Sequence, residues 1–231
     1  MLINFDHVLG FGKMTNQDFI YSCPEGILEK KENPDDALNK GWIPWKGKWY
    51  NHRSVRINLK KYYPSKSTKK DLNKIEATFC AINELKDNNR IEEIYDIYCK
   101  KNNFIKSTLI QDIVHESSCF FEFKKNNQIK GYTFCTLYKK SMVSSEFIQD
   151  FTCDNISLGS ISQHHECSQA RSLEKDYVYI LGGYETTCLY KCNFHGMEWW
   201  TGKEWTTDID LYKKLCERDS KIKIENYDNN F

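Results

Sequence analysis

The feature of this sequence that most restricts its fold is a run of three expected strands joined by two short polar turns. The strands cover Phe120 to Phe123, Ile129 to Tyr138 and Met142 to Phe151, where apolar and aromatic residues dominate. Residues 124–128 and 139–141 form the turns. Connections of that length cannot cross over a sheet, so the three strands are expected to pair antiparallel, as a meander.

A second group of elements follows the meander and adds a crossover. The turn Ser157–Ser160 precedes a helix-length polar stretch that ends near Glu174, and residues 177–183 form a buried strand that ends in two glycines. A strand, a turn, a helix and a strand in this order make a crossover unit. Residues 188–195 predict a further strand, and 208–216 a closing amphipathic helix. The order predicts an α/β fold with a mixed central sheet flanked by helices.

The segment before the meander is expected to be mainly helical. Asn33 to Asp36 has the chemistry of a turn and a helix start, which predicts a short helix over residues 35–40. Residues 71–100 carry apolar side chains at helical spacing, in two sets that Asn88 and Asn89 separate. The first set is Ile75, Phe79, Ile82 and Leu85, and the second is Ile91, Ile94, Tyr95 and Tyr98. A third short helix is expected near Leu109 to Ile113.

Composition narrows the class of protein. The 231 residues are 40% hydrophobic and 14% aromatic, which is typical of an ordered globular chain with one domain, or one domain and a small subdomain. No run approaches 18 apolar residues, and the N-terminus lacks the pattern of an export signal. We therefore expect a soluble cytoplasmic protein with no membrane partner. The ten cysteines stand singly, without a C-x-x-C pair, and are expected to be reduced core residues.

Two cysteine-based sites are weak alternatives. Cys188, Cys192 and His195 could form a zinc site with His164, His165 or Cys167, but their spacing is irregular for zinc. A thiol nucleophile at Cys167 or Cys188 would need a histidine partner that nothing in the sequence specifies. We expect no metal and no cofactor.

A basic segment is the main candidate for binding. Between Lys46 and Lys74 ten Lys and Arg face a single acid in a chain whose net charge is +1. Residues 54–60 alternate apolar and polar, which predicts a strand with one buried face and one face of cations. Pro64 ends the strand, and the following hydroxyl residues can cap a helix that begins near Lys69. Such a segment suits phosphate groups, although a solvated strand edge with a lysine-rich turn would look the same.

Three blocks of sequence resemble a known family. They are residues 41–70 (GWIPW…KWYNHRSVRINLKKYYPSKSTKK), 142–160 (MVSSEFIQDFTCDNISLGS) and 177–205 (YVYILGGY…YKCNFHGMEWWTGKEW). In this order and approximate spacing they resemble the arginyl- and leucyl-tRNA–protein transferases, which move an amino acid from aminoacyl-tRNA to the N-terminal amine of a protein. The resemblance implies a GNAT-like acyltransferase fold over residues 41–231. Residues 1–40 would be a reduced version of the family's N-terminal region.

The chain departs from the family at three places. The family's C-x-x-C beside the basic strand is replaced by residues 51–54, and only Cys23 remains of a cysteine-rich N-terminal module. The segment between Leu181 and Lys191 is about three residues shorter and lacks a Lys-Met pair. These departures leave the donor amino acid and the acceptor open.

The resemblance and the residue chemistry together assign roles. Aminolysis of an ester needs a general base near the amine and N–H groups near the carbonyl oxygen. The candidates for proton transfer are Glu146, Asp150 and Glu122. The candidates for substrate contact are Ser157, Leu158, Gly159, Ser160, Tyr184, Tyr190, Lys191 and Glu198. The candidates for tRNA phosphates are Arg53, Arg56, Lys60, Lys61, Lys66, Lys69 and Lys70. A helix cap without a ligand, solvated carboxylates and surface lysines remain the alternatives.

The expected partners are an aminoacyl-tRNA that carries Arg or Leu and the amine of a protein or peptide, with no DNA. An N-acyltransferase that uses acyl-CoA or an acyl carrier protein is the alternative. It would need a Gln/Arg-x-x-Gly-x-Gly/Ala turn, which residues 157–160 do not match. A non-catalytic module that binds RNA or a degron is a third possibility.

Overall fold

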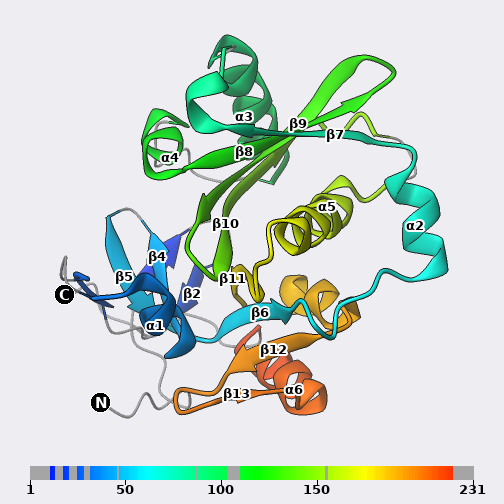
Figure 1. The fold of residues 1–231 in the computed structure, drawn as a ribbon. Coiled ribbons are helices and arrows are strands. Elements are labelled where there is room, and N and C mark those ends of the chain that lie inside the picture. Colours follow the sequence, from blue (N-terminus) through cyan, green and yellow to red (C-terminus); the bar gives the residue numbers. More distant parts are fainter. Residues whose placement is uncertain are drawn as a thin grey trace.

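The centre of the molecule is an eight-stranded mixed sheet (Figure 1). The computed structural model describes residues 11–13, 18–20, 25–28, 32–45, 47–86, 88–102, 110–153 and 156–220. The strand order is β13-β12-β6-β11-β10-β9-β8-β7. Their bounds are β6 Ser54–Asn58, β7 Glu76–Ala81, β8 Cys119–Lys125, β9 Gln128–Leu137, β10 Ser141–Gln149, β11 Tyr177–Gly182, β12 Met197–Trp200 and β13 Trp205–Thr206. Because β10 and β11 run parallel while the other neighbours are antiparallel, the expected mixed sheet is confirmed.

The expected meander forms one half of this sheet. Strands β8, β9 and β10 pair antiparallel through short turns, as predicted. The turn residues Asn126 and Asn127 have positive φ angles of 53° and 60°, which asparagine tolerates better than most residues. Strand β10 contains a bulge between Ser144 and Glu146. A bulge turns the side chains that follow it and increases the local twist of the strand.

Helices cover both faces of the meander. Helices α3 (Asn88–Asn102) and α4 (Ile110–Glu116) lie on one face, where Ile91 and Ile94 pack with Phe134 and Ile148. Helix α5 (Leu158–Ser172) lies on the other face (Figure 1). Helix α2 (Lys66–Leu72) packs beside α5, and α6 (Ile209–Asp219) packs beside the 3₁₀ helix η2 (Thr186–Asn193). The helices expected at 91–98, near 110, after Ser157 and at 208–216 are therefore confirmed.

A small three-stranded sheet covers the centre of the main sheet near residues 143 and 179. It consists of β3 (Glu25–Gly26), β5 (Lys48–Asn51) and β4 (Trp42–Trp45). Helix α1 (Pro34–Asn39) packs beside it and begins with an Asn33 cap, which confirms the expected short helix. Leu38 and Ile43 pack against Val143 and Tyr179. Strands β1 (Phe11–Lys13) and β2 (Asp18–Ile20) pair with each other.

Two expectations about secondary structure are wrong. The helix expected from Ile75 to Leu85 is strand β7 followed by the 3₁₀ turn η1 (Ile82–Glu84). Phe79 lies opposite Phe121 of β8, so sheet pairing outweighed an apolar spacing that also fits a helix. The strand expected at 188–195 is the 3₁₀ helix η2, and the next strand, β12, begins at Met197. Within the described residues, no helix has the length and apolar character that a membrane span requires.

Candidate active site

The parallel strands β10 and β11 pair only at one end and then separate. Ser141 to Val143 pair with Tyr177 to Tyr179, and no further pairing follows, although β10 continues to Gln149 and β11 to Gly182. We call the place just beyond Val143 and Tyr179 the fork. The bulge of β10 begins at Ser144, which is the first residue beyond the last paired one. The fork therefore leaves main-chain groups of two central strands without their usual partners.

The three sequence blocks that resemble the transferases form consecutive strands of the main sheet, and two of the blocks contribute the strands that border the fork. Residues 41–70 contribute β6, residues 142–160 contribute most of β10 and the first turn of α5, and residues 177–205 contribute β11 and β12. In the sheet, β12, β6, β11 and β10 are consecutive neighbours. Segments far apart in the sequence thus form one continuous region around the fork.

Lys191 occupies the edge of β11 at the fork. Its ammonium group donates to the carbonyl oxygens of Gly182 at 2.6 Å, Ile180 at 2.8 Å and Leu181 at 3.5 Å, and the residue is 5% exposed. The amide of Gly183 donates to the carbonyl of Arg53, the residue just before β6. Across that trans peptide the Gly182 carbonyl must point the opposite way, toward the side from which β10 has separated. Lys191 therefore satisfies carbonyls that a paired β10 would have bonded.

These contacts define what Lys191 can offer chemically. All its hydrogen-bond partners among the described residues are main-chain carbonyls rather than the carboxylate that a buried cation usually takes. The pKa of the neighbouring His52 is lowered to about 4, mainly by burial and further by the positive charges of Lys191 and Arg53. The fork thus carries a positive charge, and no acid in the described part of the chain lies within hydrogen-bond distance of it.

The turn at residues 157–160 forms the N-terminus of α5. The Ser157 carbonyl accepts from the amides of Ser160 and Ile161, while the Ser157 side chain makes no capping hydrogen bond. Leu158 is buried, and Gly159 lies against Phe147 of β10. The turn therefore sits beside the separated half of β10, where the amides of a helix start favour a negatively charged or carbonyl oxygen.

The three candidate carboxylates do not gather at one place. Glu146 follows the bulge and is half-buried. Asp150 lies beyond the end of β10, where it pairs with Arg90 at 3.2 Å and Lys130 at 3.6 Å. On β8, Glu122 pairs with Lys124 at 2.6 Å and accepts from Tyr132 at 3.3 Å. Of the three, Glu146 is the one beside the fork, because the ion pairs of Asp150 and Glu122 hold them elsewhere.

The candidate tyrosines differ in the same way. Tyr190 is 40% exposed, and its hydroxyl accepts from Gln163 of α5 at 3.1 Å. Tyr98 of α3 lies close to Glu146 and Tyr190. Its pKa is raised mainly by burial and further by these two groups. Tyr184 instead accepts from the Arg53 amide at 3.0 Å, so its hydroxyl supports the end of β6.

The prediction of a cationic, solvent-facing side on β6 is wrong, because both faces of the strand are buried. Residues 54–57 are all buried, and Trp205 of β13 covers the polar side. Arg56 is 7% exposed and bonds Glu198 at 2.8 and 2.9 Å, so the candidate substrate residue Glu198 is also engaged. Arg53 is 0% exposed and lies 2.8 Å from Asp219. Neither arginine presents its guanidinium group to a phosphate on the surface.

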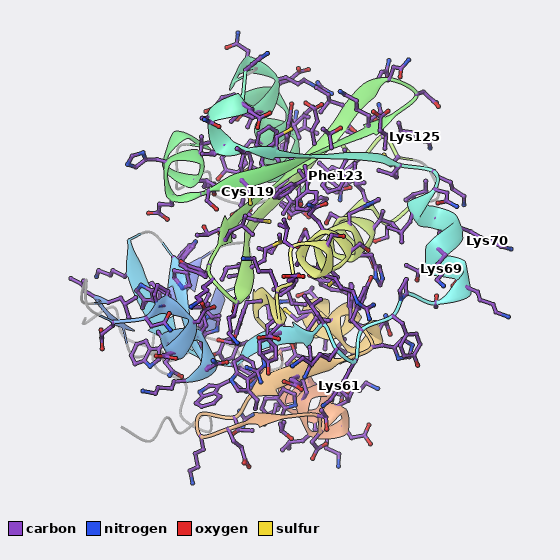
Figure 2. The ribbon with its side chains drawn as sticks, viewed as in Figure 1. Lys61, Lys69, Lys70, Cys119, Phe123 and Lys125 are labelled. Atoms are coloured by element: carbon purple, nitrogen blue, oxygen red, sulfur yellow. The ribbon has the colours of Figure 1, made fainter. Side chains whose placement is uncertain are left out.

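The lysines of the same segment do face solvent. The side chains of Lys60 and Lys61 are 83% and 60% exposed, and each lies within 3.5 Å of an acid, Asp176 and Glu198 respectively. Lys66, Lys69 and Lys70 are exposed on α2. Figure 2 shows Lys69 and Lys70 on α2 at the outer edge of the molecule and Lys61 lower in the view, on the segment after β6. The cations available to a phosphate backbone therefore lie on α2 and on the segment before it.

One buried acid was not among the candidates predicted from the sequence. Glu166 on α5 is 0% exposed, and burial raises its pKa to about 7. In the sequence it stands within a polar helix, where a glutamate gives no signal of burial. Two of the candidate histidines have other partners: on the same helix, His164 forms a hydrogen bond with the Tyr62 hydroxyl at 2.8 Å, and His195, which lies after η2, stacks on Tyr63. The described residues bring no three metal-binding side chains together.

The meander, the crossover helix and the separated parallel pair define a GNAT-like α/β fold. Similar solved structures include the C-terminal DUF2156 domain of a protein described as a lysylphosphatidylglycerol synthetase from Agrobacterium fabrum, with TM-score 0.48 and 7% identity over 57% of this chain and 46% of that one. L-PGS from Bacillus licheniformis gives TM-score 0.45 and 8% identity over 73% and 66%. A GCN5-related glucosamine N-acetyltransferase region of a fungal multi-domain GH3 β-N-acetylglucosaminidase gives 0.40 and 10% over 76% and 23%.

This chain spans less than two thirds of the length of each of these three structures. No family model matches the chain, and no curated protein matches it.

Proposed function

We propose that this chain is an acyltransferase that joins the amino acid of an aminoacyl-tRNA to the amine of a protein or peptide. The observation that carries the proposal is that the three family-like blocks, which are far apart in the sequence, supply four consecutive strands of one sheet, including the two strands that form the fork. By the resemblance of those blocks, the donor is arginyl- or leucyl-tRNA. The divergence at residues 181–191 leaves the choice between them to experiment.

The fork offers the groups that aminolysis needs. The first turn of α5 supplies main-chain amides beside β10, which suits the carbonyl oxygen of an ester as negative charge develops on it. Glu146, close to Tyr98, is the carboxylate placed to interact with an incoming ammonium group. Lys191 adds a positive charge at the edge of β11, which favours a substrate oxygen or carboxylate there. The amine attacks directly, so the reaction needs no covalent intermediate on the protein.

The lysines around α2 supply a surface for the RNA. Lys66, Lys69 and Lys70 lie on a helix that packs beside α5, so they belong to the same layer as the turn at residues 157–160. Lysines bind phosphates mainly through charge, which makes the affinity sensitive to salt and insensitive to sequence. A tRNA held on this surface would bring its charged end toward the start of α5.

A direct transfer assay tests the proposal. Purified protein is incubated with tRNA that carries radiolabelled arginine, leucine or another amino acid, together with peptides that differ in their N-terminal residue. We expect label in peptide with one charged tRNA and none when the peptide amine is acetylated. The Lys191→Met variant should lose transfer, whereas Lys203→Met, which changes an exposed lysine on the β12–β13 turn, should not.

The choice of donor is tested separately by thermal stabilisation. A bound ligand raises the melting temperature in proportion to the logarithm of its concentration over its Kd. We expect charged tRNA to stabilise the protein and coenzyme A to have no effect. Stabilisation by coenzyme A alone, with transfer from acyl-CoA to an amine, would replace the proposal with an N-acyltransferase.

A further inference from the structure

A carboxyl group lies fully buried behind the fork, and no cation among the described residues forms an ion pair with it. Glu166 on α5 is 0% exposed, and neither of its carboxylate oxygens makes a hydrogen bond of good geometry with the described residues. Three hydroxyls lie close to it, from Thr133 of β9, Ser144 of β10 and Ser162 of α5. The Thr133 hydroxyl also lacks a hydrogen-bond partner, while Ser162 donates to the Gly159 carbonyl at 2.9 Å.

The surroundings of Glu166 contain thiols and hydroxyls but no cation paired with it. The titratable groups that face it are Cys119 of β8, Cys135 of β9 and Cys167 of its own helix. Burial is the main reason that the pKa values of Cys135 and Cys167 are raised, and the charge of Glu166 raises them further. Burial likewise raises the pKa of Glu166 to about 7, while the three hydroxyls act to lower it. The group can therefore hold or release a proton near neutral pH.

Ser144 connects this carboxyl to the fork. It is the first residue of β10 after the last pair with β11, and it begins the bulge. Ser144 is 8% exposed whereas Glu166 is 0% exposed, so the serine is the more accessible residue of the two. A buried acid without a cationic partner is rare in proteins, and bulges are frequent beside active sites, so its position next to the bulge of β10 points to a functional role.

We propose that Ser144 and Glu166 form a proton relay that deprotonates the acceptor amine at the fork. Glu166 acts through Ser144 and is a positioning residue, since only the Ser144 hydroxyl meets the substrate. This inference rests on the proposed function, because it assumes that an amine attacks a carbonyl carbon there. It adds a route for the proton that the candidate carboxylates of the sequence do not supply.

The relay accounts for every proton in the reaction. The acceptor ammonium gives one proton to the Ser144 oxygen while the Ser144 hydroxyl gives its own proton to the Glu166 carboxylate. The neutral amine then forms the C–N bond as the ester C–O bond breaks. The proton that the amine loses on becoming an amide goes to the leaving ribose oxygen. Glu166 afterwards returns its proton to solvent through Ser144, which restores the carboxylate.

The first test follows protonation without any substrate. Infrared difference spectra between pH 5 and pH 9 report the carboxylic-acid C=O band, and subtraction of Glu166→Gln isolates this residue. In the wild type we expect the band to disappear with a midpoint near pH 7 as the pH rises. In Ser144→Ala the band should still be present at low pH and should still disappear as the pH rises. A Glu166 carboxyl that stays in one protonation state over this range would overturn the relay.

The second test uses single-turnover transfer as a function of pH. The wild-type rate should fall on the acid side with a midpoint near pH 7, and both Glu166→Gln and Ser144→Ala should lower the rate by about 100-fold or more and remove that limb. Glu174→Gln, an exposed acid after the same helix, is the matched control and should keep the wild-type profile. Melting temperatures measured first show that each variant is folded.

The two proposals can fail separately. Transfer from charged tRNA with an unchanged acid limb in Glu166→Gln would reject the relay and leave the proposed function standing. If no charged tRNA supports transfer, the proposed function fails. In that case the relay is rejected unless acyl-CoA supports transfer whose acid limb disappears in Glu166→Gln and Ser144→Ala.

Discussion

The Arg53 guanidinium lies 2.8 Å from the Asp219 carboxylate, and this ion pair joins the middle of the main sheet to the last turn of α6. Arg53 is 0% exposed and the Asp219 side chain 6%. The same guanidinium donates to the Gly183 carbonyl at 3.4 Å and lies 4.8 Å from the Tyr184 ring centre. A residue expected to meet phosphate therefore fixes the segment after β11, which leads into η2 and Lys191.

Removal of the Asp219 charge should destabilise the protein strongly. Asp219→Asn leaves the Arg53 cation buried without its carboxylate, and loss of one partner of a buried ion pair lowers the free energy of unfolding by about 3–5 kcal/mol. Glu217→Gln changes an exposed acid on the same helix and should stay within about 0.5 kcal/mol of the wild type. Urea denaturation measures both. Equal midpoints for the two variants would show that the pair contributes nothing.

Arg56 should not tolerate replacement by lysine. Its guanidinium carbon lies 3.9 Å from the Tyr177 ring centre and 4.1 Å from that of Trp205, and it bonds Glu198 through two nitrogens. Lysine offers neither a planar group to stack nor two fixed donors, so Arg56→Lys should lower the free energy of unfolding by about 2 kcal/mol or more. Lys61→Arg, at the exposed partner of the same carboxylate, is the control. A double-mutant cycle with Glu198→Gln gives the coupling energy.

The sequence predicted the elements whose patterns are local. Short turns between strands dictated the meander of β8, β9 and β10, and the amphipathic helix α6 followed from its own periodicity. The burial of β6 could not be predicted in this way, because residues distant in sequence, among them Trp205, cover its polar face. Arg56 in an alternating strand looks the same whether water or an indole ring lies above it.

The candidate site was predicted only in part, because it also depends on contacts between residues that are distant in the sequence. The three blocks form neighbouring strands, and of the candidate residues Glu146 and Tyr190 lie near Tyr98 while Lys191 lies against β11. Lys191 was a candidate for substrate contact, but its ammonium group donates to carbonyls of β11 that β10 no longer pairs with after the two strands separate. Glu166 was missed because a glutamate among histidine, serine and glutamine indicates an exposed helix face. Separation of strands and burial of single polar groups are properties of the assembled sheet.

Lys191 should be important for stability as well as for transfer. Lys191→Met keeps the length of the side chain but removes the donor to the Ile180 and Gly182 carbonyls. Each buried carbonyl left without a donor lowers the free energy of unfolding by about 1–3 kcal/mol. The measurement is urea denaturation beside Lys203→Met. Unchanged stability would mean that water replaces the ammonium group easily, and hence that the carbonyls are not sealed from solvent.

The lysines of α2 should govern the salt dependence of RNA binding. The double variant Lys69→Glu, Lys70→Glu removes two cations from the exposed side of α2 and should weaken tRNA binding for every tRNA tested. The slope of log K against log salt should become shallower by about 2. Lys139→Glu, Lys203→Glu changes the net charge equally at exposed sites away from α2. If both double variants weaken binding to the same degree, the effect is one of net charge and the surface on α2 is not the binding site.

Glu166 should give the protein a component of stability that decreases as the pH rises. Its pKa is about 7 in the folded protein against 4.5 for an ordinary glutamate, because burial disfavours the charged form. Between these values the folded state holds a proton that the unfolded state has lost, so stability is full below about pH 4.5, falls as the pH rises toward 7 and is constant above. The loss is roughly 3 kcal/mol, at about 1.4 kcal/mol per pH unit.

Glu166→Gln should remove this component and be more stable than the wild type above pH 7. Buried histidines act in the opposite sense, since burial lowers the pKa of His52 and His164 to about 4 and stability is lost as the pH falls from 6.5 toward that value. The two trends overlap in the wild type. The difference between wild type and Glu166→Gln, measured by urea denaturation from pH 4 to pH 9, isolates the glutamate because the histidines are common to both. A difference that does not change with pH would mean that Glu166 has the same pKa in the folded and unfolded chain, and therefore that this carboxyl is not shut away from water behind Ser144.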